Sequence, residues 1–138
     1  IYTLSLHDAL PILVIALVAA GALPACGPKN SPEGIAAAFL ERIYKGDADG
    51  AIELAHLPAS GKADQDERHL DRLKSHIARA RQAADQAGGL KSVEIQSSKA
   101  NPRDPNRAIV QALVHFAQRQ RQERVPLILI NGQWKIFL

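Results

Sequence analysis

The spacing of apolar residues changes at Gly88-Gly89, and this change divides the predicted domain into a helical and a stranded half. Before this pair, apolar side chains recur at steps of three and four residues, which is the spacing of one face of an α-helix. After it, apolar and polar residues alternate with a period of two, as in half-buried strands. The sequence therefore predicts an α+β fold in which helices come first and an antiparallel sheet follows.

Three helices are predicted in the first half. The first has Ser31 as its N-cap and Pro32 at its first helical position, and Gly46 ends it. Asp47 can cap a short second helix. The third and longest covers 64–87. Its apolar stripe consists of Leu70, Leu73, Ile77, Ala80, Ala84 and Ala87.

About four strands are predicted in the second half, over 93–96, 108–117, 125–130 and 134–138. Their loops are expected at 101–106, from its composition, and at Asn131-Gly132, which favours a tight type I′ hairpin. The polar, basic stretch 118–124 is expected between the second and third strands. It is either an exposed hairpin tip, or an electrostatic contact for lipid headgroups or an acidic partner through Arg119, Arg121 and Arg124. We expect the helices to wrap across the concave side of a curved sheet.

An apolar segment without a charged residue covers 13–22. It is shorter than the roughly 20 residues that span a bilayer comfortably, and it has the length of a signal-peptide core. A buried core helix is the competing interpretation, but such a helix would show a polar face, and this segment has none. We therefore expect an apolar signal helix before the domain.

The segment Leu23-Pro24-Ala25-Cys26 follows directly and resembles the bacterial lipobox, in which the cysteine thiol becomes a diacylglyceryl thioether. Cys26 is the only cysteine, so it cannot form an intrachain disulfide. A catalytic thiol would need a nearby histidine and a lowered pKa, for which the end of an apolar leader offers no basis. The resemblance implies a lipid anchor, and Gly27 in place of an aspartate implies sorting to the outer membrane, facing the periplasm.

Residues 1–12 differ from an ordinary signal-peptide start. They carry no basic residue, and the chain contains no methionine. This segment resembles the translation of a sequencing adapter, so we expect that it is not native. The expected organisation is a non-native leader (1–12), the signal segment with its lipobox (13–26), a turn-rich tether (27–31) and one α+β domain (32–138).

Composition supports one globular domain in 138 residues, with 46% apolar and 22% charged residues. The net charge is +3, and all 17 Lys and Arg residues follow Cys26. This basic character is either an attraction for anionic surfaces or an ordinary solvated surface. Because aromatic residues make up only 4% of the chain, there is no stacking platform for bases, and nucleic acid is not an expected partner.

Four motifs together are similar to small bacterial lipoprotein domains of unknown function in the nuclear transport factor 2-like superfamily. They are Ser31-Pro32-Glu33-Gly34, Phe39-Leu40 with Tyr44-Lys45-Gly46-Asp47, the segment 88–94 and the segment 131–136. The resemblance extends from Ser31 to Ile136. It implies a cystatin-like α+β roll, in which a cone lies between helices and sheet, and it implies no particular ligand.

Metal chemistry has little support in the sequence. His69 and His76 are seven residues apart, which separates their Cα atoms by about 10 Å along a helix. There is no His-x-x-x-His pair and no Cys/His cluster. We expect solvated histidines, with neither a metal nor another cofactor.

The candidate pocket residues are Tyr44, His115 and Trp134, and Glu94 is a further candidate for acid–base chemistry. Enzymes of the superfamily place aspartate, histidine or tyrosine in the cone, where apolar surroundings tune the pKa. No motif here matches those enzymes, so no catalytic residue is assigned. Trp134 shares one strand face with Ile136 and Leu138, and this face is expected against the long helix, near Leu73 and Ile77.

Two functions remain open. The first is a non-catalytic, membrane-anchored periplasmic domain that binds a small apolar ligand or a partner protein. The second is a small hydrolase- or isomerase-like enzyme that uses the cone. A closed pocket with Tyr44 or His115 beside a carboxylate would favour the enzyme, and a cone filled by apolar side chains would favour binding or a structural role.

Overall fold

The computed structural model describes residues 28–138, which contain three helices and five strands. In chain order these are α2 (Pro32–Lys45), α3 (Ala48–Glu53), β1 (Ala55–His56), α4 (Ala63–Gln86), β2 (Leu90–Asn101), β3 (Asp104–Phe116), β4 (Gln120–Ile130) and β5 (Gln133–Phe137). The predicted signal helix at 13–22 and the lipobox Leu23-Pro24-Ala25-Cys26 lie outside the described residues, as does the leader 1–12. None of α2, α3 and α4 has the length and apolar character that a membrane span requires.

The ends of the first two helices lie where the sequence predicts them. The Ser31 hydroxyl accepts a hydrogen bond from the backbone N–H of Gly34 at 3.1 Å, which caps α2. Gly46 ends α2 in the left-handed conformation, with a φ of 79°. The Asp47 carboxylate accepts from the N–H of Gly50 at 3.0 Å and caps α3. Local side-chain chemistry therefore defines these boundaries.

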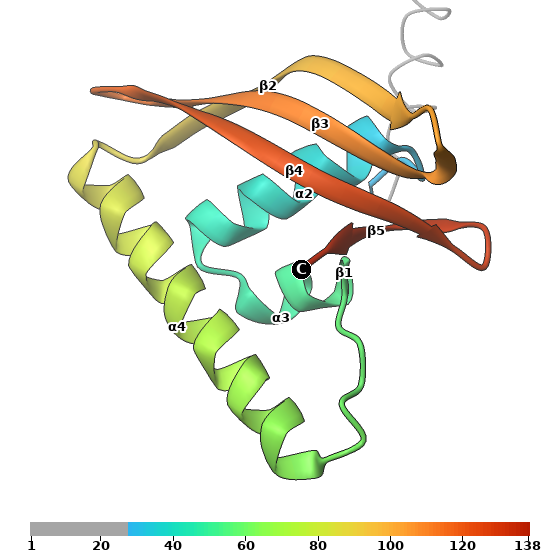
Figure 1. The fold of residues 1–138 in the computed structure, drawn as a ribbon. Helices are drawn as coiled ribbons and strands as arrows, with labels where there is room; N and C mark the ends of the chain where they lie inside the picture. The colour runs from blue at the N-terminus through green and yellow to red at the C-terminus, as the bar shows by residue number, and fades with distance from the viewer. Residues whose placement is uncertain (1–27) are drawn as a thin grey trace, which may run out of the picture.

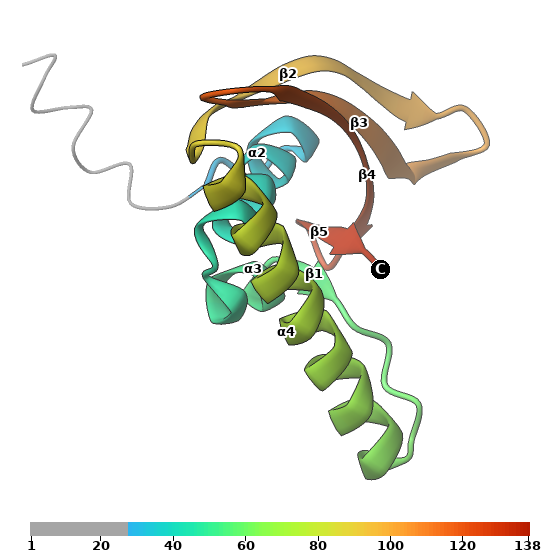
Figure 2. The same cartoon turned by 90° about the vertical axis from the view of Figure 1, so that its left-hand side faces the viewer.

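The strands form one curved sheet in the order β1-β5-β4-β3-β2, which confirms the predicted antiparallel sheet. A fifth strand, β1, was not predicted. It pairs in parallel with β5, with Ala55 opposite Ile136, and two residues carry too short a pattern to read. The pairing of β2 with β3 shifts register at three places, and bulges or irregularities of this kind bend strands. Figure 2 shows the resulting arch over the helices.

The loops at the two ends of β3 are shorter than predicted. Asn101 pairs with Asp104, so the turn consists of Pro102 and Arg103 rather than the whole of 101–106. At the other end, β4 begins at Gln120 and not at residue 125, because backbone pairing with β3 continues through the polar stretch. The hydrogen bonds of a ladder join backbone groups, so a polar stretch can extend a strand, as it does here. The final turn at Asn131-Gly132 has the positive φ angles, 51° and 77°, that a type I′ hairpin requires.

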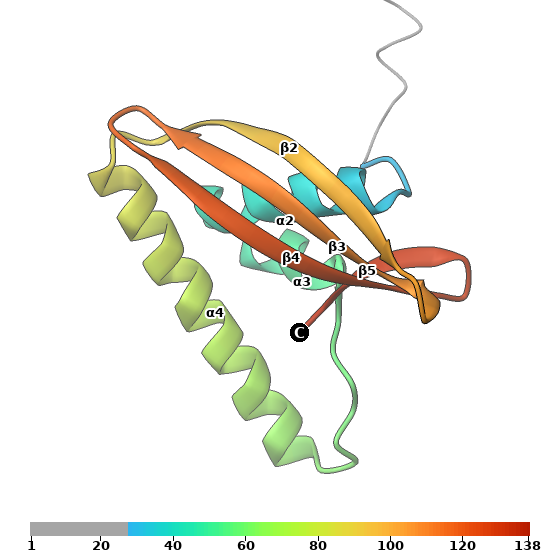
Figure 3. The same ribbon diagram turned by 45° about the horizontal axis from the view of Figure 1, so that its top comes forward.

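The core lies between α2 and the concave face of the sheet (Figure 1). Alternate residues of β3 face inward and are almost fully buried: Ala108, Val110, Ala112, Val114 and Phe116. From the other side, α2 contributes Ile35, Phe39 and Leu40 to the same cluster. The long helix α4 packs on α2 and α3 through Ile77 and Ala84, beside the β4 edge of the sheet (Figure 3).

Candidate functional site

A cavity of about 320 Å³ lies in the cone between α2, α4 and the strands β4 and β5. Most of its wall is apolar, formed by Phe39, Leu40, Ile43, Leu73, Ile77, Ala80, Val125, Pro126, Ile136 and Leu138. It is open to solvent beside β4. This opening exists because β5 pairs only with Leu127–Ile130, so the first part of β4 has a strand on one side alone.

The polar side chains of the cavity wall are those of Tyr44, His76, Glu123 and Arg124, and two of them, Tyr44 and Glu123, belong to one hydrogen-bonded cluster. The Tyr44 hydroxyl donates a hydrogen bond to Oε1 of Glu123, and the Nε atom of Arg121 lies 2.7 Å from the same oxygen. The Tyr44 ring meets Phe116 edge to face, with centroids 5.0 Å apart. Only 7% of Tyr44 is exposed. Burial first, and then the Glu123 carboxylate, raise the pKa of Tyr44, so at neutral pH its hydroxyl remains a protonated donor.

Two different periodicities bring this cluster together. Tyr44 lies in the last turn of α2, four residues after the buried Leu40, and therefore on the same face of the helix. Glu123 lies on β4 opposite Ala112, and Arg121 opposite Val114, both of which face the core. The cluster thus joins the end of a helix to a strand 79 residues later in the chain.

Of the predicted pocket residues, only Tyr44 lies in the cavity wall. The structure places His115 on the opposite face of the sheet, because Val114 and Phe116 on either side of it point inward. There, Nε2 of His115 lies 2.9 Å from Oε2 of Glu94. This pair is therefore separated from the cone by the sheet itself, and the expectation that His115 and Glu94 serve the cone is corrected.

Trp134 is half-buried against the core and does not line the cavity. Its backbone N–H donates to Oδ1 of Asn30 at 3.0 Å, and the Asn30 amide donates to the carbonyl of Gly132 at 2.8 Å. Trp134 therefore lies at the start of β5, close to the residues that precede α2. Ile136 and Leu138, on the same strand face, line the cavity together with Leu73 and Ile77.

Glu123 lines the cavity and Arg121 is its partner, and neither is predicted from the sequence as a residue of the cone. The signal is present, because Leu127 and Val125 are inward positions and the period of two continues through Glu123 to Arg121. The polar stretch 118–124 is predicted as a connection between strands, so the period is not extended into it. Within residues 28–138, no three histidine, cysteine or carboxylate side chains lie together as a metal site would require.

A family model described as a domain of unknown function, DUF4878, matches residues 24–137. The chain belongs to this family. The fold of residues 28–138 is nuclear transport factor 2-like, as the following match shows. A proposed NTF2-like transpeptidase from Campylobacter jejuni has a similar crystal structure, with a TM-score of 0.70 and 24% identity over 78% of this chain and 98% of that one.

A designed protein with the NTF2 fold also matches, with a TM-score of 0.39 and 17% identity over 72% of this chain and 76% of that chain. No curated protein sequence matches the chain. The comparisons therefore establish the family and the fold.

Proposed function

We propose that this DUF4878 domain binds a small, largely apolar ligand in its cone, on a chain anchored to the bacterial envelope through Cys26. The observation that carries the proposal is the cavity of about 320 Å³ with an apolar wall and one polar cluster. Ligand sites are typically concave, mostly apolar and roughly 300–1,000 Å³ in volume, with a few placed polar groups. The cavity therefore suits a small ligand.

The polar cluster indicates what else such a ligand would carry. Tyr44 and Arg121 both approach Oε1 of Glu123, and this leaves Oε2 as the carboxylate oxygen for a further donor. A ligand hydroxyl or amide N–H would meet an acceptor there that is held in place by two neighbours. We therefore infer an apolar body with one hydrogen-bond donor.

An enzyme is the second candidate, because Tyr44 lies beside a carboxylate in the cone. A covalent hydrolase or transpeptidase needs a nucleophile, and the residues lining this cavity include no serine, threonine or cysteine. An isomerase needs only a base, for which Glu123 and His76 of the cavity wall are the candidates. Oε1 of Glu123 is engaged by Tyr44 and Arg121, so Oε2 is the oxygen that could accept a proton.

Binding can be tested with N-phenyl-1-naphthylamine, a neutral apolar dye, and the fragment 29–138 after its cooperative unfolding has been verified by circular dichroism. We expect saturable fluorescence enhancement. Ala80→Phe places a ring in the cavity wall and should weaken binding at least about tenfold. Ala78→Phe is the matched control, since Ala78 lies on the exposed face of the same helix. Equal affinities for the two variants would contradict the proposal.

Turnover separates the two candidates. Native mass spectrometry of the chain purified from its own cell envelope should identify a bound compound. A binding protein returns this compound unchanged after prolonged incubation, whereas conversion would support the enzyme, and Glu123→Gln should then abolish the conversion.

A further inference from the structure

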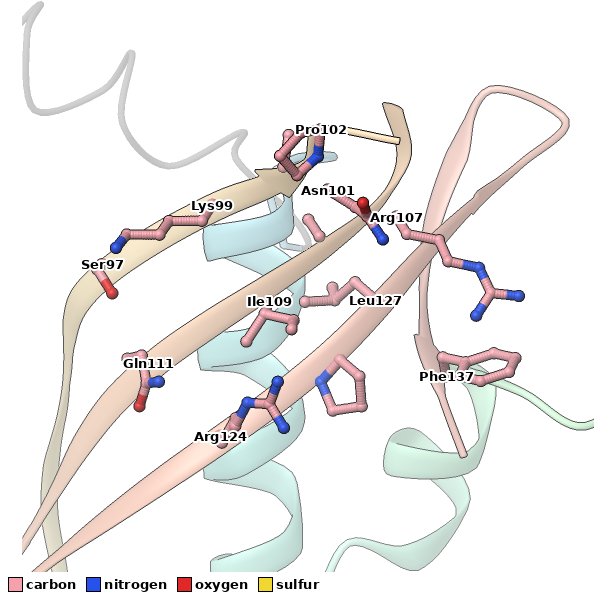
Figure 4. Close-up of a pocket in the computed structure, with 13 residues that line it drawn as sticks. Ser97, Lys99, Asn101, Pro102, Arg107, Ile109, Gln111, Arg124, Leu127 and Phe137 are labelled. Atoms are coloured by element: carbon pink, nitrogen blue, oxygen red, sulfur yellow. The ribbon is translucent and has the colours of Figure 1, made fainter. Parts of the chain in front are cut away.

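A second and larger cavity, of about 540 Å³, lies on the outer face of the sheet, where no helix of the described chain covers it. Residues from β2, β3, β4 and β5 line it. Figure 4 shows α2 behind the strands, while the lining side chains lie in front of them. Arg124 and Pro126 border both this outer groove and the cone, so β4 alone separates the two cavities.

The floor of the outer groove is apolar. Ile109 and Pro126 are direct partners on neighbouring strands, and Phe137 of β5 stands beside them. The open face of an antiparallel sheet is normally polar, since only its other face contributes to the core. A contiguous apolar area on the open face is therefore a feature that packing within this domain does not require.

Basic residues surround this floor. Lys99, Arg107 and Arg124 line the groove, and no aspartate or glutamate does. The Arg107 guanidinium lies 4.6 Å from the centroid of the Phe137 ring and 3.4 Å from Asp104. Among residues 28–138, Lys99 and Arg124 form no ion pair. Two cations beside an apolar floor thus lack an intramolecular anion.

The combination of charge and apolar surface defines the ligand class. A bare phosphate would use the cations and leave the floor exposed, whereas a neutral lipid would use the floor and leave the cations without a partner. We propose that the outer groove binds a single-chain anionic amphiphile. Its phosphate or carboxylate head is held by the basic rim, and its alkyl chain lies over Ile109, Pro126 and Phe137.

Octyl phosphate is a probe with both parts. The full chain is held in phosphatidylcholine nanodiscs, and binding is measured by equilibrium dialysis against empty discs. We expect saturable binding of octyl phosphate, and binding at least about tenfold weaker for inorganic phosphate and for 1-octanol, because each lacks one half of the interaction.

The variants locate the site. The double variant Lys99→Gln/Arg124→Gln should weaken octyl phosphate binding about tenfold or more, since charge-assisted hydrogen bonds to the head are lost. Lys74→Gln, an exposed cation on α4, is the matched control and should bind as the parent does. Ala80→Phe, which narrows the cone, should also leave octyl phosphate binding unchanged.

Four outcomes would overturn the proposal. They are no saturable binding, equal binding by the double variant and Lys74→Gln, inorganic phosphate binding as tightly as octyl phosphate, and loss of binding in Ala80→Phe alone. The last outcome would place the amphiphile in the cone instead. If the groove is shielded from solvent only in discs that contain phosphatidylglycerol, and octyl phosphate does not bind, its occupant is a membrane surface. If the chain forms a dimer that depends on the groove residues, its occupant is a second copy of the chain.

Discussion

At the scale of single residues, the Tyr44 hydroxyl affects both the packing of the fold and the candidate ligand site. It connects α2 to β4 by a hydrogen bond to a carboxylate, in a wall that is otherwise mostly apolar. Hydrogen bonds to charged groups are stronger than neutral ones, and burial of the phenol excludes water as a substitute partner. The contact therefore holds the cavity wall together and also orients Glu123 for a ligand.

Removing this hydroxyl should alter both stability and its dependence on pH. Tyr44→Phe is expected to lower the free energy of unfolding by about 1.5 kcal/mol at pH 7. Because the folded state raises the pKa of Tyr44 above its ordinary value of 10.0, this stabilisation is complete below pH 10 and is lost as the pH rises toward the folded pKa. Urea unfolding of the parent and Tyr44→Phe from pH 7 to 11 measures this.

The difference between the two proteins should shrink above pH 10. A difference that stays constant or grows over this range would show that the hydroxyl is not held protonated by the fold. Phe116, against which the Tyr44 ring packs, remains in contact in the variant, so lost ring packing does not confuse the comparison.

At the scale of elements, the turn between β3 and β4 caps the C-terminus of α4. The backbone N–H groups of Gln118 and Ala117 donate to the carbonyls of Ala87 and Gly89 at 2.9 and 3.2 Å. The Arg119 guanidinium donates to the Ala83 carbonyl at 3.4 Å. The Ala87 carbonyl at the C-cap has no partner within the helix, and the N–H of Gln118 supplies one. Arg119 therefore lies exposed at this turn and also contacts the end of α4.

Two adjacent glycines provide a matched test of this docking. Gly88 and Gly89 have φ angles of 88° and 90°, so an alanine at either position should cost about 1–2 kcal/mol of backbone strain. A Cβ at Gly88 would also lie 2.6 Å from Cβ of Ala117, whereas one at Gly89 would meet nothing within 4 Å. We expect Gly88→Ala to cost about 1–3 kcal/mol more than Gly89→Ala.

Urea unfolding measures this comparison. When the unfolding free energies of the two variants depend on urea concentration with the same slope, the difference between their midpoints gives the difference in stability. Equal losses of stability in the two variants would mean that the turn is not packed closely on the end of α4.

At the scale of the whole molecule, the proposed anchor would orient the domain. Asn30, which contacts the β4–β5 turn, is four residues after Cys26, and such a segment spans at most about 14 Å. A lipid on Cys26 would therefore hold the start of α2 close to the bilayer. The cone is lined by the second half of α2, from Phe39 to Tyr44, so its opening would lie on the part of the domain farther from the membrane.

The anchor is tested in a Met-initiated gene expressed in bacteria with radiolabelled palmitate. We expect the parent to incorporate label and Cys26→Ser to incorporate none and to remain unprocessed. Ser31→Ala, which leaves Leu23-Pro24-Ala25-Cys26 intact, should be labelled as the parent is. Radiolabel in Cys26→Ser would refute the anchor.

The expectation that residues 1–12 are not native is tested by resequencing the locus. We expect the new sequence to show a methionine and basic residues in their place.

The sequence by itself determined the features that depend on neighbouring residues. Ser31, Gly46 and Asp47 act on backbone groups within a few residues of themselves, so helix ends could be predicted without the fold. The Asn131-Gly132 turn depends likewise on local φ angles. Periodicity indicated the class, because the periods of helix and strand differ whatever each element packs on.

Tertiary structure decided which residues share a cavity. Glu123 faces the cone because the ladder between β4 and β3 continues through the polar stretch, and only the observed pairing shows that the period of two extends that far. Pairing also placed Ile109 beside Pro126 under the outer groove, and set the two-residue β1 against β5. Such contacts join residues far apart in the chain, and their free energy depends on every other strand being in place.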